Sequence, residues 1–197
     1  MANKHSDGMP WKVEDYLNAT NYNIDPRYVP SEFALEFVTF IKLVNGKQGE
    51  ENKTPLVHYY MLDTLTKGGT RVINLCHRGA AKTTVMGEYL FLYIATYGEV
   101  PGFGKLDLAL YVSDSIENGI KNMRKNLEFR WENSEFLRQY VPRIHFTDIR
   151  WEFENADGKL FIVKGYGAKA LSLDSELHTL TGRTTIGECQ VGDLIFG

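Results

Sequence analysis

The segment from Arg71 to Thr84, RVINLCHRGAAKTT, constrains the fold more than any other part of the chain. An apolar run with strand character ends at Cys76, a short turn of small and polar residues follows, and an apolar stretch typical of a helix begins at Val85. Strand, tight turn, Lys-Thr and helix is the order found in phosphate-binding loops, because the amide N–H groups and dipole of a helix start favour an anion. The sequence therefore predicts an α/β fold built around this loop.

The residue types of the loop have separate expected roles. Lys82 would reach the outer phosphates, and the hydroxyl of Thr83 would hold Mg²⁺. The remaining expected cofactor-binding positions would surround the phosphates with their backbone, and they are Gly79, Ala80, Ala81 and Thr84. The usual pattern GxxxxGK[ST] has glycine where this chain has Cys76 and Ala81, so the pattern alone also fits a basic turn between a strand and a helix. The change from strand to helix at Lys82 favours the phosphate loop.

Two helices are predicted ahead of the loop. Ser31 opens the first, which carries an apolar stripe and stops at Gly46, and Pro55 opens the second, which ends at Gly68 and Gly69. His58 lies in the second helix. Two interpretations of His58 stay open: a half-buried polar residue on a helix, or a side chain that recognises the edge of an adenine base.

A second strand–helix unit is predicted after the loop, from Leu108 to Trp131, with Asp114 and Glu117 as a capping box at the helix start. The capping role argues against Asp114 as the carboxylate that positions Mg²⁺ at the end of a strand. Residues 150–167 are predicted to form a β-hairpin around an Asp-Gly turn. Two successive β–α units predict a parallel sheet with helices packed on it.

The last segment, LSLDSELHTLTGRTTIGECQVGDLIFG (171–197), has a different character. Short strand-like pieces alternate with Thr-Gly and Gly-Asp turns, which predicts an all-β fragment. So short a fragment cannot bury a core alone, and we expect its partner strands to come from elsewhere. The formal net charge of −3 gives no basic footprint for nucleic-acid binding by the whole chain, and the longest apolar stretch is too short to span a membrane.

Residues 31–169 resemble the N-terminal part of the ATPase domain of tailed-bacteriophage terminase large subunits, the motors that package DNA. The resemblance is carried by TPLVHYYMLD (54–63), INLCHRGAAKTT (73–84), LYVSDSIENGIKNMRKNL (110–127) and FIVKGYGAKA (161–170). It implies a partial P-loop NTPase sheet of the RecA/ASCE type with flanking helices, binding ATP and Mg²⁺. Lys82 and Arg78 would then be catalytic, with Arg78 contacting the γ-phosphate, and His58 would stand at the adenine-reading position.

Residues 170–197 resemble the first block of an intein, a short all-β fragment of the Hint type. That block normally begins with Cys or Ser, whereas this chain has Ala170, so the expected splice junction is Lys169–Ala170 without its usual nucleophile. Residues 1–30 are polar and turn-rich, which predicts an N-terminal arm. Together the resemblances imply a partial ATPase domain acting as N-extein (31–169) and an N-terminal intein piece (170–197). The chain would then be the N-terminal half of a naturally split terminase gene, and truncation of a longer, contiguous intein-containing gene is the alternative.

The resemblances also imply partners and a location. A complementary intein half would carry the rest of the terminase, and double-stranded DNA, the portal and the small terminase subunit would be partners only in the assembled motor in the host cytoplasm, with no membrane. The assembled protein would be an ATPase, and this chain alone would turn over little ATP. Two alternatives are an association module for protein splicing whose terminase part is only an inactive structural extein, and an inactive remnant of a nucleotide-binding fold.

Overall fold

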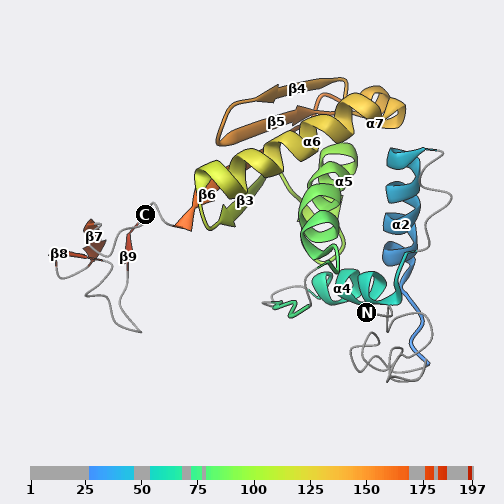
Figure 1. Ribbon diagram of the computed structural model, residues 1–197, viewed down its shortest axis with the longest axis horizontal. Coiled ribbons are helices and arrows are strands. Elements are labelled where there is room, and N and C mark those ends of the chain that lie inside the picture. The colour runs from blue at the N-terminus through green and yellow to red at the C-terminus, as the bar shows by residue number, and fades with distance from the viewer. Residues whose placement is uncertain are drawn as a thin grey trace, which may run out of the picture. The chain divides into compact units, whose positions relative to one another are not determined.

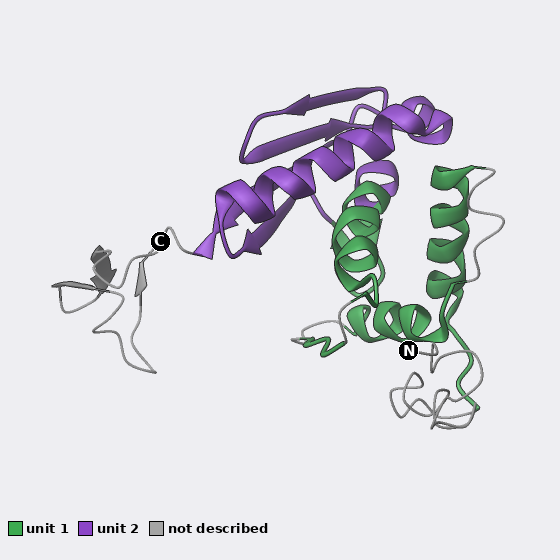
Figure 2. Ribbon diagram, in the orientation of Figure 1, with its two compact units in different colours: residues 1–93, 99–105 green, residues 94–98, 106–197 purple. Residues whose placement is uncertain are grey.

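The computed structural model describes residues 27–46, 54–67, 72–76, 79–168, 176–179, 182–185 and 195–196. The described part of the chain is mixed α/β (Figure 1). The chain divides into two compact units, which Figure 2 colours separately. Unit 1 comprises Met1–Tyr93 and Glu99–Lys105, and unit 2 comprises Ile94–Gly98 and Leu106–Gly197.

The first helix of unit 1, α2 (Glu32–Asn45), confirms the sequence prediction. The side chain of Ser31 accepts a hydrogen bond from the amide of Ala34 at 3.2 Å, which is the expected N-cap interaction. Gly46 ends the helix with φ 56°, a left-handed conformation that glycine adopts at little cost. The apolar stripe is buried; it consists of Phe33, Ala34, Phe37, Val38, Phe40 and Val44.

The second helix, α4 (Leu56–Leu65), follows Pro55 as predicted. Asp63 on this helix accepts hydrogen bonds from the hydroxyl of Tyr28 and, at 3.1 Å, from the amide of Ser31. The pKa of Tyr28 is raised, first because burial disfavours its charged form and then because it donates to Asp63. Tyr28 belongs to the expected N-terminal arm, and this contact anchors the end of that arm on α4.

The helix after the loop has two parts, η1 (Thr84–Tyr89), with π-helical hydrogen bonding, and α5 (Leu90–Tyr97). Tyr93 packs its ring 5.1 Å from the ring of Phe37 and 5.3 Å from that of Phe40, and these aromatic contacts attach the loop helix to α2. A short antiparallel pair, β1 (Glu99–Val100) and β2 (Gly104–Lys105), completes unit 1.

The predicted strand before the loop is wrong for the described residues 72–76, which form no strand. Ile73 and Leu75 are 82% and 85% exposed. A strand is stabilised by hydrogen bonds to a neighbouring strand, and no described strand pairs with this segment. The segment therefore has the apolar residues typical of a buried strand, but it lacks a neighbouring strand in the described sheets.

Unit 2 contains a four-stranded sheet in the order β3-β6-β5-β4. Its strands are β3 (Leu108–Ser113), β4 (Arg143–Phe146), β5 (Arg150–Glu154) and β6 (Leu160–Gly167). β3 and β6 pair in parallel, whereas β4, β5 and β6 are antiparallel neighbours. The sheet is therefore mixed, not parallel throughout as predicted, because the confirmed hairpin β5–β6 and the unpredicted β4 add antiparallel pairs.

A long helical segment follows β3, made of η2 (Ile116–Ile120) and α6 (Lys121–Asn133), and a short helix, α7 (Glu135–Tyr140), follows it. The predicted cap is corrected by one residue. Ser115, and not Asp114, is the N-cap, since its side chain accepts a hydrogen bond from the amide of Asn118 at 3.2 Å. The other member of the predicted capping box, Glu117, instead pairs with Lys121 at 2.8 Å.

The helical segment η2–α6 covers one face of the sheet (Figure 1). Side chains alternate between faces along a strand, and the helix-facing residues of the central strands, Trp151, Phe153, Phe161 and Val163, are buried together with Ile120, Met123 and Leu127. The opposite face is exposed on β3, where Leu108, Leu110 and Val112 are 51%, 60% and 63% accessible. β3 is also an edge strand within the described sheet. Its sequence suits burial on both faces, yet one face is open.

The hairpin turn is organised by Asn155, whose side-chain oxygen accepts from the amides of Asp157 and Lys159 at 3.0 and 2.9 Å. Gly158 has φ 77°, which confirms the predicted Asp-Gly turn. In the C-terminal segment, β7 (Glu176–Thr179), β8 (Gly182–Thr185) and β9 (Ile195–Phe196) form an antiparallel sheet in the order β8-β7-β9. Among the described helices, none has the length and apolar character needed to cross a membrane.

Candidate functional site: the loop before η1

The loop that leads into η1 contains two left-handed residues, Gly79 with φ 93° and Ala81 with φ 51°. Ala81 is the single non-glycine residue with positive φ among the described residues. A left-handed alanine costs about 1 kcal/mol or more relative to its ordinary conformations. Ala81 occupies the position where the usual phosphate-loop pattern has glycine. The loop thus adopts, at Ala81, a backbone conformation for which glycine would be the natural choice.

The helix begins immediately after this turn. The carbonyl of Ala81 accepts a hydrogen bond from the amide of Val85 at 2.9 Å, so Lys82 and Thr83 lie in the first turn. The first amide groups of a helix have no intrahelical acceptor, and the helix dipole adds a partial positive charge there. Lys82 and Thr84 are partly exposed, and Thr83 is exposed. This end of the helix combines amides, a cation and hydroxyls that together suit an anionic ligand.

His58 of α4 reaches this turn from outside it. Its Nε2 lies 2.8 Å from the carbonyl oxygen of Ala80, and its side chain is 7% exposed. A carbonyl oxygen only accepts, so Nε2 carries the hydrogen and donates it. The structure thus brings together His58, Ala80, Ala81 and Lys82, residues that the sequence had assigned to one site. Sequence reasoning missed the contact between His58 and Ala80, because no local pattern links two residues so far apart in the chain.

Three of the residues assigned from the sequence, Arg78, Lys169 and Ala170, lie outside the described residues. The expected contact of Arg78 with a γ-phosphate and the expected splice junction both remain predictions.

The donors for a metal ion are few in the described part of the chain. No group of three or more His, Cys, Asp or Glu side chains there is arranged to hold a metal. Mg²⁺ often binds through only one or two protein ligands, with phosphate oxygens and water completing its shell. Thr83 is an exposed residue in the first turn, so its hydroxyl would fit that requirement as one ligand beside a phosphate.

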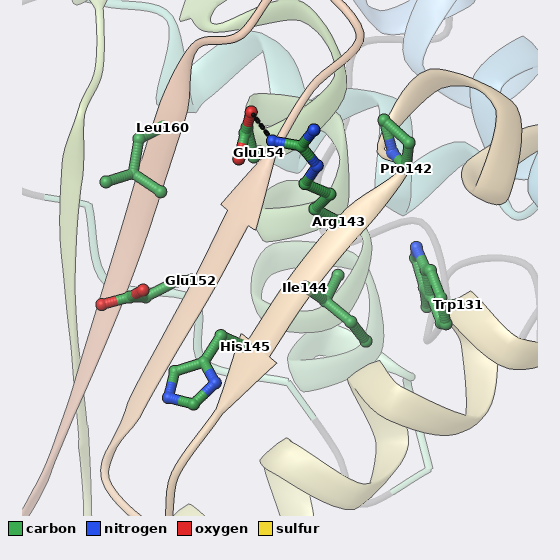
Figure 3. Close-up of a pocket in the computed structure, with 8 residues that line it drawn as sticks. All are labelled: Trp131, Pro142, Arg143, Ile144, His145, Glu152, Glu154 and Leu160. Carbon is green, nitrogen blue, oxygen red and sulfur yellow. Dashed lines mark hydrogen bonds and ion pairs between the residues drawn. The ribbon is translucent and has the colours of Figure 1, made fainter.

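A second candidate is a hollow of about 480 Å³ in unit 2, lined by Trp131, Pro142, Arg143, Ile144, His145, Glu152, Glu154 and Leu160 (Figure 3). Its charged groups already have partners, because Arg143 pairs with Glu154 across the strands at 2.9 Å and Arg150 pairs with Glu152 at 2.6 Å. The hollow is open to solvent and includes no residue of the loop before η1. The loop is therefore the stronger candidate.

A scan against models of protein families and searches of curated proteins and of solved structures find no match to this chain.

Proposed function

We propose that the chain is the N-terminal portion of an ATP-driven DNA-packaging motor of the terminase type, and that its loop before η1 binds the phosphates of ATP. The observation that carries the proposal is the left-handed conformation of Ala81 directly ahead of Lys82 at the start of a helix. An alanine held at positive φ marks a loop whose backbone shape is maintained despite its local cost. The resemblance of residues 73–84 to the terminase loop supplies a reason for that shape.

In the proposed site, Lys82 neutralises the outer phosphates and the first-turn amides donate hydrogen bonds to them. Thr83 would contribute its hydroxyl to a Mg²⁺ ion, which would bridge phosphate oxygens and offset their charge. These residues supply binding and electrostatic stabilisation. Hydrolysis also needs a group that activates water, and we assign none of the described residues to that step. The chain alone is therefore proposed to bind ATP and to hydrolyse it slowly.

The test is ATP binding by the full chain, measured by calorimetry or with a fluorescent ATP analogue. Lys82→Ala should weaken binding about tenfold to a hundredfold, because a hydrogen bond from a charged donor contributes roughly 1.5–3 kcal/mol. The matched control is Lys125→Ala, since Lys125 is an exposed lysine on α6. Equal affinities for the wild type and Lys82→Ala would contradict the assignment, and no binding by the wild type would favour an inactive extein or remnant.

A splicing role for residues 170–197 is the second part of the proposal. Three short antiparallel strands, β7, β8 and β9, agree in type with the all-β fragment that the resemblance implies. We expect the chain to associate with a complementary intein half through added strands, without a Cys-initiated thioester at Ala170. Mixing the two halves and measuring complex formation tests the association. Thiol-induced cleavage after Lys169 would contradict the expected absence of a thioester.

A further inference from the structure

The hydrogen bond from His58 to the carbonyl of Ala80 constrains the peptide group between Ala80 and Ala81. The peptide between Ala80 and Ala81 is planar and trans, so its carbonyl oxygen and its amide hydrogen point in opposite directions. Because the oxygen of Ala80 is held by His58 on α4, the amide hydrogen of Ala81 points away from α4. A phosphate in such a loop is bound by amide hydrogens and repelled by carbonyl oxygens, so the orientation of this peptide matters for binding.

The left-handed conformation of Ala81 disfavours the observed orientation of this peptide. Rotating the peptide would turn φ of Ala81 from its value of 51° towards the negative values that alanine prefers, and it would turn the Ala80 oxygen around at the same time. Local preference at Ala81 thus favours the wrong orientation for a phosphate site. A hydrogen bond from a side chain outside the loop can offset that preference.

The burial of His58 makes its hydrogen bond stable. The side chain is 7% exposed, so water competes little for Nε2, and losing the partner would leave a buried polar group unsatisfied. We propose that His58 is a positioning residue, which holds the Ala80–Ala81 peptide so that the Ala81 amide faces the phosphates and the Ala80 oxygen does not. This inference rests on the proposed nucleotide site and assigns His58 a part in phosphate binding instead of base recognition.

Variants of His58 test the proposal in the full chain. His58→Phe keeps a ring of similar size without a donor, and His58→Gln places an amide nitrogen close to the position of Nε2. We expect His58→Phe to weaken binding of ATP and of GTP by the same factor, between about twofold and tenfold, from the loss of one buried hydrogen bond. We expect His58→Gln to bind both nucleotides nearly as tightly as the wild type.

The effect of His58→Phe is also measured in a second background, the variant Ala81→Gly. Glycine takes the left-handed conformation without the penalty of a Cβ, so the loop should depend less on His58 when residue 81 is glycine. The factor by which His58→Phe weakens nucleotide binding should therefore be smaller in the Ala81→Gly background than in the wild type. Unchanged ATP and GTP affinity in His58→Phe would overturn the proposal. A loss confined to ATP would also overturn it, and would assign His58 to adenine recognition.

Nuclear magnetic resonance of the chain without nucleotide separates this inference from the proposed function. The wild type should show His58 protonated at Nε2, and the Cα and Cβ shifts of Ala81 should report a left-handed residue. In His58→Phe these shifts should move towards ordinary negative φ, provided that circular dichroism shows the helices intact. Protonation at Nδ1 alone, or an unchanged Ala81, would overturn the positioning role. Absence of nucleotide binding by a wild type with the expected spectra would instead refute the proposed function.

Discussion

Gly165 on β6 tests how closely the helix after β3 packs on the sheet. A Cβ at this position would lie 2.4 Å from Cγ2 of Ile120 and 3.3 Å from its Cδ1, whereas carbon atoms in contact stay about 3.5–4.0 Å apart. Ile120 is 0% exposed and cannot turn its methyl group into solvent. The helix or the strand must therefore move by about 1 Å, and overpacking of this kind costs roughly 1–3 kcal/mol.

The assay is urea unfolding of Gly165→Ala followed by circular dichroism. With a slope of about 2 kcal/mol per molar urea, a cost of 2 kcal/mol lowers the midpoint by about 1 M. Gly104→Ala is a control for backbone conformation alone, since a Cβ there meets no atom within 4 Å while φ is 71°. We expect that control to lose about 1 kcal/mol.

The double variant Gly165→Ala with Ile120→Ala identifies the cause. Removing Cγ2 of Ile120 leaves room for the new methyl group, so the double variant should be more stable than the sum of the two single effects by about 1 kcal/mol or more. An unchanged midpoint for Gly165→Ala, or strictly additive effects in the double variant, would refute the close packing of η2 on β6.

Two further predictions concern the hydrogen bond from Tyr28 to Asp63 and the N-cap of η2. The difference in unfolding free energy between the wild type and Tyr28→Phe should be constant up to about pH 10 and shrink above it. The pKa of Tyr28 is raised in the folded protein, so the unfolded chain loses the hydroxyl proton first as the pH rises. A difference that does not depend on pH in alkaline urea titrations would contradict this. Ser115→Ala should cost about 1 kcal/mol in thermal or urea unfolding and Asp114→Ala much less, and the reverse order would restore Asp114 as the cap.

Local signals were enough to predict most helices. Ser31, Gly46 and Pro55 are residues whose side chains or backbones determine a helix end by themselves, so the bounds of α2 and the start of α4 followed from the sequence. The hairpin from β5 to β6 was predicted for the same reason, since the Asp-Gly turn is a local feature. The cap at η2 was missed by one residue because Asp114 and Ser115 are both good capping residues and only the helix geometry chooses between them.

Long-range features were harder to predict. The apolar run of residues 72–76 indicates a strand, but a strand forms only when another strand is beside it, and that condition is not local. The mixed direction of the sheet was missed because β4 has only four residues, too few for its alternation to indicate a strand, and because the pairing of β3 with β6 is not a local feature. In the candidate site, the loop around Lys82 was predicted from the change in residue character along the chain, whereas the hydrogen bond from His58 to Ala80 required the fold.

The open apolar face and free edge of β3 have a consequence for how the isolated chain behaves in solution. Leu108, Leu110 and Val112 are presented beside backbone groups that have no strand on that side in the described sheet. Such an edge accepts any extended segment with little selectivity, including the same strand of another copy. Pairing between copies becomes faster with concentration, whereas folding within one copy does not. Self-association of the chain should therefore increase steeply as its concentration rises, and Val112→Lys should reduce it.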